Sequence, residues 1–125
     1  MNPISKEIKI GIIGEIFVQL RFLQYDVQAA PALKDSGNDL IAVKGDIFKA
    51  IQVKTSTKDN FTLKDLNKRK YHILALVKLV GENDTIHLDK SRIYLLQKSE
   101  VIKTSYKIDE LSEKVLSKER VIELF

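Results

Sequence analysis

Apolar residues recur with helical spacing near the beginning of the chain. Ser5 can cap a helix there, with Glu7 in its first turn. The apolar positions that follow lie three or four residues apart and form one stripe: Ile8, Ile12, Ile16, Leu20 and Leu23, widened by Ile13 and Phe17. The pattern predicts an amphipathic helix of several turns whose stripe packs against the body of the domain.

Glu15 and two glycines stand out within this helix. On a helical wheel Glu15 falls at the border of the stripe, so its carboxylate is expected to reach into the domain while its stem packs. Gly11 and Gly14 each cost a helix about 1 kcal/mol relative to alanine. Two glycines beside one acid indicate close packing or room for a ligand, and the alternative is that the helix merely tolerates them.

Residues 38–54 have the alternation of a β-hairpin. Apolar β-formers fill both arms, and Lys44-Gly45 stands where a two-residue turn would need a positive φ. With that turn, Ile41 lies opposite Phe48 and Asp39 opposite Ala50. Because side chains alternate along a strand, one face of the hairpin carries Asp39, Ile41, Val43, Phe48, Ala50, Gln52 and Lys54.

Three polar groups therefore converge at the open end of an otherwise apolar hairpin. They are the acid of Asp39, the amide of Gln52 and the amine of Lys54. A hydrophobic core does not accommodate three such groups unless they bond to one another or to a ligand. This end of the hairpin is the strongest candidate for a functional site.

The remaining elements are shorter and are predicted from local patterns. Residues 27–32 form a strand at a sheet edge, because Pro31 cannot donate to a ladder. The mostly apolar residues 71–80 form a central strand. Further predictions are a strand at 61–63, a short helix at 64–70, strands at 85–88 and 91–95, and one or two helices from residue 108 onward.

Composition narrows the class of protein. The 125 residues are 44% hydrophobic and 30% charged, which suits one globular domain spanning residues 1–125. The chain has no cysteine, which excludes disulfides and thiolate metal sites and favours a reducing compartment, so we expect a cytoplasmic, intracellular protein. No apolar run has the length of a membrane span, and we expect no membrane partner. The net charge of +4 is a mild indication of a nucleic-acid partner.

The order of these elements and polar residues resembles the PD-(D/E)XK nuclease superfamily, which has the restriction-endonuclease-like fold. That resemblance implies an α/β fold with an α-β-β-β-α-β core, a mixed central sheet flanked by helices, and here an extra C-terminal helix. The family's first-helix acid matches Glu15, the acid at the start of its second core strand matches Asp39, and its E-x-K triplet matches Gln52-Val53-Lys54. The resemblance covers roughly residues 5 to 80.

The chain departs from the family pattern at two positions. Asn38 stands where the family usually has proline. Gln52 replaces the acid of the triplet, which removes one formal charge from the metal site. Some family members, including a homing endonuclease encoded in a group I intron, carry Q-x-K and remain active. Glutamine still offers an oxygen to a hard cation.

The resemblance implies hydrolysis of DNA phosphodiester bonds with Mg²⁺, or with Mn²⁺ as a substitute. Glu15, Asp39, Gln52 and the backbone carbonyl of Val53 would be the metal ligands. Lys54 would orient the attacking water or balance the charge that grows on the phosphate. The basic residues that follow the triplet would neutralise flanking phosphates: Lys58, Lys64, Lys68, Arg69 and Lys70. A solvated basic face is an equally good interpretation of them.

Several functional alternatives remain at this point. Within the nuclease class, a homing or restriction-type endonuclease ranks first and an enzyme resembling Holliday junction resolvases is close behind. Cutting both strands would require a homodimer or a higher oligomer such as a tetramer. Outside that class, the chain is a catalytically inactive nuclease fold that binds nucleic acid or a protein partner, or a plain α/β interaction module whose three polar groups point to different faces.

Overall fold

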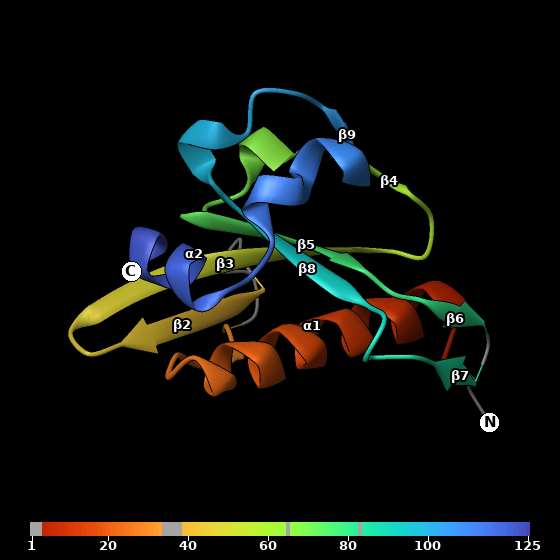
Figure 1. The fold of residues 1–125 in the computed structure, drawn as a ribbon, viewed down its shortest axis with the longest axis horizontal. Helices are drawn as coiled ribbons and strands as arrows, with labels where there is room; N and C mark the ends of the chain where they lie inside the picture. Colours follow the sequence, from red (N-terminus) through yellow and green to blue (C-terminus); the bar gives the residue numbers. More distant parts are fainter. Residues whose placement is uncertain (1–3, 34–38, 65, 83) are drawn as a thin grey trace.

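A five-stranded mixed sheet in the order β1-β2-β3-β5-β8 forms the middle layer of the protein (Figure 1). The computed structural model describes residues 4–33, 39–64, 66–82 and 84–125. The sheet strands are β1 (Gln28–Pro31), β2 (Leu40–Lys44), β3 (Ile47–Ser56), β5 (Ile73–Lys78) and β8 (Arg92–Gln97). Only the β3–β5 pair is parallel. The strand predicted at 71–80 is therefore central, and β1 with its Pro31 lies at the edge, as expected.

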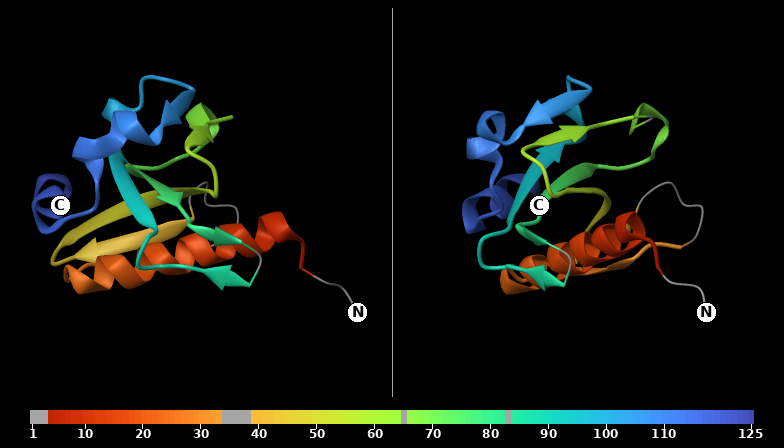
Figure 2. Two further views of the ribbon diagram at one scale, coloured as in Figure 1. Left: turned by 45° about the vertical axis from the view of Figure 1, so that its right-hand side comes forward. Right: turned by 90° about the vertical axis from the view of Figure 1, so that its right-hand side faces the viewer.

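Different elements cover the two faces of this sheet (Figure 2). Helices α1 (Lys6–Gln24) and α2 (Lys118–Leu124) pack on one face through a cluster that includes Phe22, Val53 and Leu95. The other face carries a second cluster that includes Leu74 and Tyr94. Its cover consists of strands β4 (Asn60–Thr62) and β9 (Ser105–Lys107) and the 3-10 helices η1 (Leu66–Lys68), η2 (Lys98–Glu100) and η3 (Ile108–Lys114). A small hairpin, β6 (Gly81–Glu82) with β7 (Thr85–Ile86), precedes β8.

Most of the predicted elements are present, with two differences of form. The helix predicted at 64–70 is only the three-residue η1, which lies where the family core has its second helix; so short a segment between two strands cannot propagate an α-helix. The C-terminal segment divides into η3 and α2. None of the helices in the described parts of the chain is long and apolar enough to cross a membrane.

The turn of the central hairpin is one residue later than predicted. Lys44 pairs with Ile47, so the two-residue turn is Gly45-Asp46, with Gly45 at φ +61°. Glycine at the first central position is typical of a type II′ turn. The new register moves each partner by two residues, so that Ile41 lies opposite Ala50. Because strand side chains alternate with a period of two, every side chain keeps its predicted face.

Helix α1 has the predicted span and caps. The Ser5 side chain accepts a hydrogen bond from the Ile8 amide at 3.2 Å. At the other end, the amides of Asp26 and Val27 donate to the carbonyls of Leu23 and Phe22, with Asp26 at φ 63°. These two bonds form a Schellman motif in which aspartate takes the position usually held by glycine.

The buried face of α1 is only partly the predicted one. Gly14, Phe17, Val18 and Phe22 are buried against the sheet, and Ile13 packs against the same cluster, so the two residues predicted to widen the stripe do contact the core. The central positions of the predicted stripe are instead exposed, at values between 44% and 59%: Ile8, Ile12, Ile16, Leu20 and Leu23. The prediction was wrong for these five because the helix is apolar on both faces, and periodicity alone does not select the buried one.

The C-terminal segment wraps around the free edge of β8. Tyr94 forms an isolated bridge with Val115, and the Leu116 amide donates to the Ile93 carbonyl at 2.9 Å. Arg120, which is only 5% exposed, then donates from Nε and Nη2 to the Leu95 carbonyl at 3.2 and 2.9 Å. The same Nη2 donates to Glu100 at 2.5 Å. One buried guanidinium thus ties α2 to the sheet and to η2.

Glu100 should make the stability of the fold depend on pH. Burial alone would raise its pKa, but hydrogen bonds from Lys114, the Gln97 backbone and Arg120 outweigh burial and lower the pKa from 4.5 to about 2. The stabilisation is therefore complete above pH 4.5 and is lost as the pH falls toward 2. We expect Glu100→Gln to lower the free energy of unfolding at pH 7 by about 2 kcal/mol. The difference from the unmodified protein should shrink between pH 4.5 and 2 in urea titrations.

Glu110→Gln is the matched control for this experiment. Glu110 also forms an ion pair, with Lys103 at 2.6 Å, but the pair lies at the surface. Its removal should change stability much less than removal of Glu100. Equal effects of the two substitutions would show that the buried guanidinium gives Glu100 no special role.

Candidate functional site

The three polar groups predicted to converge lie where β2 ends beside β3. The last paired residues are Leu40 and Ile51, and just beyond them the Asp39 side chain reaches Gln52. The Asp39 amide donates to the Ile51 carbonyl at 3.0 Å, and its carbonyl accepts from the Ala32 amide at 3.0 Å. Both neighbouring strands thus fix the backbone of Asp39.

The Asp39 carboxylate replaces the missing strand at this point. Beyond Ile51, β3 continues to Ser56 with β5 on one side, while β2 no longer pairs on the other. Asp39 Oδ2 accepts a hydrogen bond from the Val53 amide at 2.8 Å, on that unpaired edge. The side chain thereby satisfies a backbone donor that would otherwise lack a partner.

Gln52 is held by the same oxygen. Its Nε2 donates to Asp39 Oδ2 at 2.8 Å, a geometry that assigns the amide orientation, since a carboxylate only accepts. Gln52 is 4% exposed, and its Oε1 is buried without a hydrogen-bond partner among the described residues. A buried oxygen without a donor costs free energy, and a ligand at the site would recover it.

Glu15 approaches this corner from α1. Burial raises the pKa of its carboxyl group, and the nearby negative charge of Asp39 raises it further. The helix can come this close because Gly14 has no side chain. A Cβ at position 14 would lie 1.9 Å from Thr55 Oγ1, on β3. Of the two readings of the glycines, close packing holds for Gly14, whereas a Cβ at Gly11 would meet nothing within 4 Å.

A cleft of about 450 Å³ opens beside these groups. Glu15 and Gly11 of α1 line one wall, and residues 53–58 line the other, with Lys54 and Lys58 among them. Lys54 is half-buried and has no ion-pair partner within the described ranges. Its ammonium group is therefore available to an anion in the cleft.

The basic residues predicted to contact nucleic acid are only partly at the cleft. Lys58 lines it, whereas the exposed residues of the η1 region do not: Lys64, Lys68, Arg69 and Lys70. Lys6 of α1 also lines the cleft, and the sequence analysis missed it. The sequence offered no signal for it, because Lys6 lies nine residues before Glu15 and a helical wheel places the two on opposite sides.

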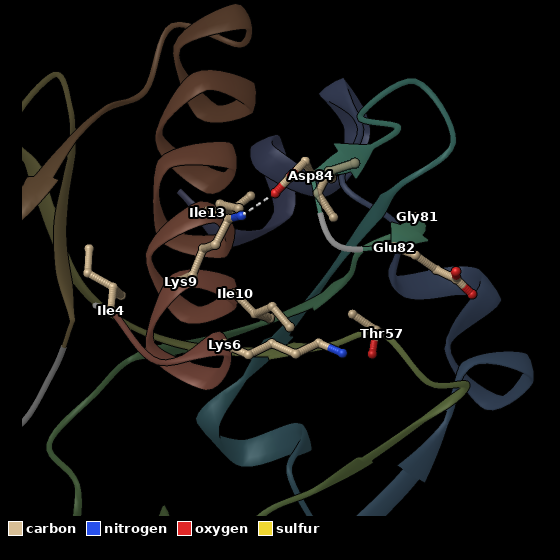
Figure 3. A pocket seen from close by; sticks show the side chains of 10 residues that line it. Ile4, Lys6, Lys9, Ile10, Ile13, Thr57, Gly81, Glu82 and Asp84 are labelled. Carbon is tan, nitrogen blue, oxygen red and sulfur yellow. Dashed lines mark hydrogen bonds and ion pairs between the residues drawn. The ribbon is translucent and has the colours of Figure 1, made fainter. Parts of the chain in front are cut away.

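A larger hollow of about 540 Å³ lies on the other side of Lys6 (Figure 3). It is formed by the first turns of α1, by Thr57 and by the β6–β7 hairpin, and Lys9 closes it through an ion pair with Asp84 at 3.2 Å. None of Glu15, Asp39, Gln52 and Lys54 lines it. Glu15 and Lys54 line the smaller cleft, whereas Asp39 and Gln52 line neither, so the smaller cleft rather than this hollow is the candidate site.

The contact between Gly14 and Thr55 can be tested by a double substitution. Gly14→Ala should lower the free energy of unfolding by about 2 kcal/mol, because the helix must move away from β3. Thr55→Ala removes the closest atom, so the double variant should lose less than the sum of the two single variants. Urea unfolding measures all three. Gly11→Ala is the control and should gain up to about 1 kcal/mol; an equal loss at both glycines would contradict the close packing.

Comparisons with known proteins bear on the fold. The sequence matches no protein-family model and has no significant match among curated proteins. Among solved structures, the chain resembles Hjc, a Holliday junction resolvase from the archaeal hyperthermophile Archaeoglobus fulgidus, determined at 1.6 Å resolution. The TM-score is 0.58 at 12% identity, and the alignment covers 92% of this chain and 97% of Hjc. The chain thus has the nuclease-like α/β fold that its sequence predicted.

Proposed function

We propose that the chain is a metal-dependent endonuclease that hydrolyses phosphodiester bonds in DNA. The observation that carries the proposal is the corner formed by Asp39, Gln52 and Glu15, where two carboxylates adjoin a buried amide oxygen without a partner. Lys54 lies two residues beyond Gln52, on the same face of β3. Like charges brought together in a partly buried site are typical of functional groups rather than of packing.

The donor set of this corner fits a hard divalent cation. Asp39 and Glu15 offer carboxylates, Gln52 offers Oε1, and the Val53 carbonyl points to the strand edge that Asp39 occupies. Oxygen ligands of this kind suit Mg²⁺ or Mn²⁺, which keep several waters. No cluster of three or more His, Cys, Asp and Glu side chains occurs in the described ranges, so the amide and backbone oxygens would complete the ligand set.

A bound cation would supply Lewis-acid polarisation of a phosphate oxygen and of the attacking water. The protein supplies position and charge. The Val53 amide holds Asp39 in place, and Lys54 offers a cation to the charge that develops on the phosphate. Lys6 and Lys58 line the same cleft, where they would hold the phosphates that flank the scissile bond.

DNA is the proposed substrate because the cleft combines these lysines with carboxylates. The net charge of +4 favours a polyanionic partner. One solved structure with a similar fold is a Holliday junction resolvase, so four-way DNA junctions are the first substrate to test, ahead of linear duplex. A restriction-type or homing-type enzyme would prefer duplex instead.

A second candidate function also has a specific observation in its favour. The Gln52 amide already donates to Asp39, so the carboxylate is partly satisfied without a cation. If the site works without a cation, the chain is a nuclease fold that binds DNA without cutting it. Cleavage assays separate the two functions.

Cleavage should require a divalent cation, Asp39 and Lys54. We expect Mg²⁺ or Mn²⁺ to support cleavage of a labelled four-way junction or a duplex, and excess chelator to abolish it. Asp39→Asn and Lys54→Ala should each lower the single-turnover rate at least 100-fold, the usual cost of losing one preorganised charge. Lys44→Ala, at the far end of the hairpin, is the matched control and should leave the rate unchanged.

Gel-shift measurements on the same variants complete this test. DNA binding should persist in Asp39→Asn, because the substitution removes a charge that repels phosphate. If the unmodified protein binds junctions or duplex but cuts neither with either cation, the endonuclease proposal is wrong and the non-cutting function stands.

Gln52→Glu restores the acid of the family triplet and tests the metal site directly. The added charge should tighten Mn²⁺ binding at least tenfold in calorimetry, because another carboxylate joins the ligand set. Without metal, the same charge lies beside Asp39 and should lower the melting temperature. Metal should then raise the melting temperature of the variant more than that of the unmodified protein. A uniform loss of stability with no gain in Mn²⁺ affinity would exclude Gln52 as a ligand.

A further inference from the structure

The outward face of α1 carries a continuous row of large apolar side chains. Its members are Ile8, Ile12, Ile16, Leu20 and Leu23 of the helix, together with Ile4 just before the N-cap, and each is between 44% and 66% exposed. We call these six residues the outer row. In Figures 1 and 2 the sheet lies on one side of α1. The exposure of the outer row shows that the sheet does not cover it.

The outer row is about as large as the largest apolar patch of a typical monomer. From the exposed fractions, it presents roughly 600 Å² of side-chain surface, the upper end of the largest patch on a typical monomer. Pairing two such rows would bury roughly 1,200 Å², the lower end of specific protein–protein interfaces. Residues that flank the row would add to this area. The patch therefore has the size that a stable dimer needs.

The spacing of the row is self-complementary. Ile8, Ile12, Ile16 and Leu20 follow at intervals of four residues within α1, which makes them one ridge of the helix surface. Two such ridges interdigitate when the helices cross at about −50°. An antiparallel two-fold arrangement centred near Gly14 places Ile12 against Ile16 of the second copy, and Ile8 against Leu20.

No charged residue interrupts the row, which favours a dry contact. Glu15 and Gln19 border it on one side, and Lys9, already paired with Asp84, borders it on the other. The antiparallel arrangement also sets opposite ends of the two helix dipoles side by side. A closed two-fold contact of this kind uses the same patch on both subunits.

We propose that the outer row is the interface of a homodimer, in which two α1 helices pack antiparallel across a two-fold axis near Gly14. The proposal does not depend on the nuclease activity, because it concerns the face of α1 opposite to the sheet.

Sedimentation equilibrium tests the dimer. The unmodified protein should sediment as a dimer at micromolar concentration. Ile12→Glu/Ile16→Glu should weaken association at least 30-fold, since it places charges at the centre of the contact. These side chains are exposed in the single chain, so circular dichroism should show an unchanged fold. Ile122→Glu is the matched control: Ile122 is a helical isoleucine of α2 that is 62% exposed, and its change should leave the dimer intact.

Cysteine cross-linking tests the orientation, because the chain has no cysteine of its own. A mixture of Ile12→Cys and Ile16→Cys chains of different length should form a disulfide-linked heterodimer under mild oxidation. A mixture of Ile8→Cys and Ile12→Cys chains should cross-link far less.

Three results would overturn the proposal. The first is a protein that stays monomeric at concentrations 100-fold above the micromolar range. The others are a dimer that survives the double glutamate substitution and cross-links that favour parallel helices. A monomer whose outer row instead binds vesicles of anionic lipid would identify a membrane surface as the occupant and would equally exclude the dimer.

Discussion

The site depends on one carboxylate that takes the place of a strand. Where β2 leaves β3, the next backbone donor on β3 belongs to Val53, and Asp39 satisfies it at 2.8 Å. The same oxygen accepts from Gln52 Nε2. A strand ladder would have filled this edge with backbone groups, and the carboxylate leaves it open instead. One pairing thus ends early and an acid takes its place, beside the stretch of β3 that lines the cleft.

The second acid reaches this edge through a different constraint. Helix α1 touches β3 so closely at Gly14 that any side chain there would overlap the Thr55 hydroxyl. The next residue, Glu15, is thereby brought near Asp39, and burial together with that charge raises its pKa. A cation would relieve both effects at once. The close packing at Gly14 and the raised pKa of Glu15 therefore have the same origin, which is the position of α1 against β3.

Sequence patterns predicted the faces of the hairpin better than they predicted the packing of the helix. The hairpin prediction held for its faces even though its turn lies one residue later, because a shift of two in register preserves the alternation that placed Asp39, Gln52 and Lys54 together. Helix α1 could not be oriented in the same way. Its sequence is apolar on opposite sides, and only contact with the sheet selects the side with Phe17 and Phe22. Lys6 was missed for the same reason, because whether its side chain lines the cleft depends on how α1 is oriented against the sheet.

The order of helices and strands along the chain was enough to predict the fold. Local sequence patterns, however, did not predict the type and length of every element. The segment at 64–70 was predicted as a helix and forms one 3-10 turn, held by Leu66 in the second core cluster. Residues 108–124 divide at Val115 because that residue bridges to β8, a contact that no local periodicity encodes. Long-range pairing of this kind is outside what the spacing of apolar residues can show.

At both borders of the central sheet, the chain hinders the addition of a further strand. At β8 the backbone of Val115 and Leu116 already occupies the edge, and at β1 the strand ends in Pro31, which has no amide hydrogen to offer. Backbone templating, the usual route from an exposed sheet to fibrous aggregates, is therefore obstructed at each margin. Such a chain can expose the apolar face of α1 without the added aggregation risk of an unprotected sheet edge. Any self-association then occurs through side chains rather than through backbone hydrogen bonds.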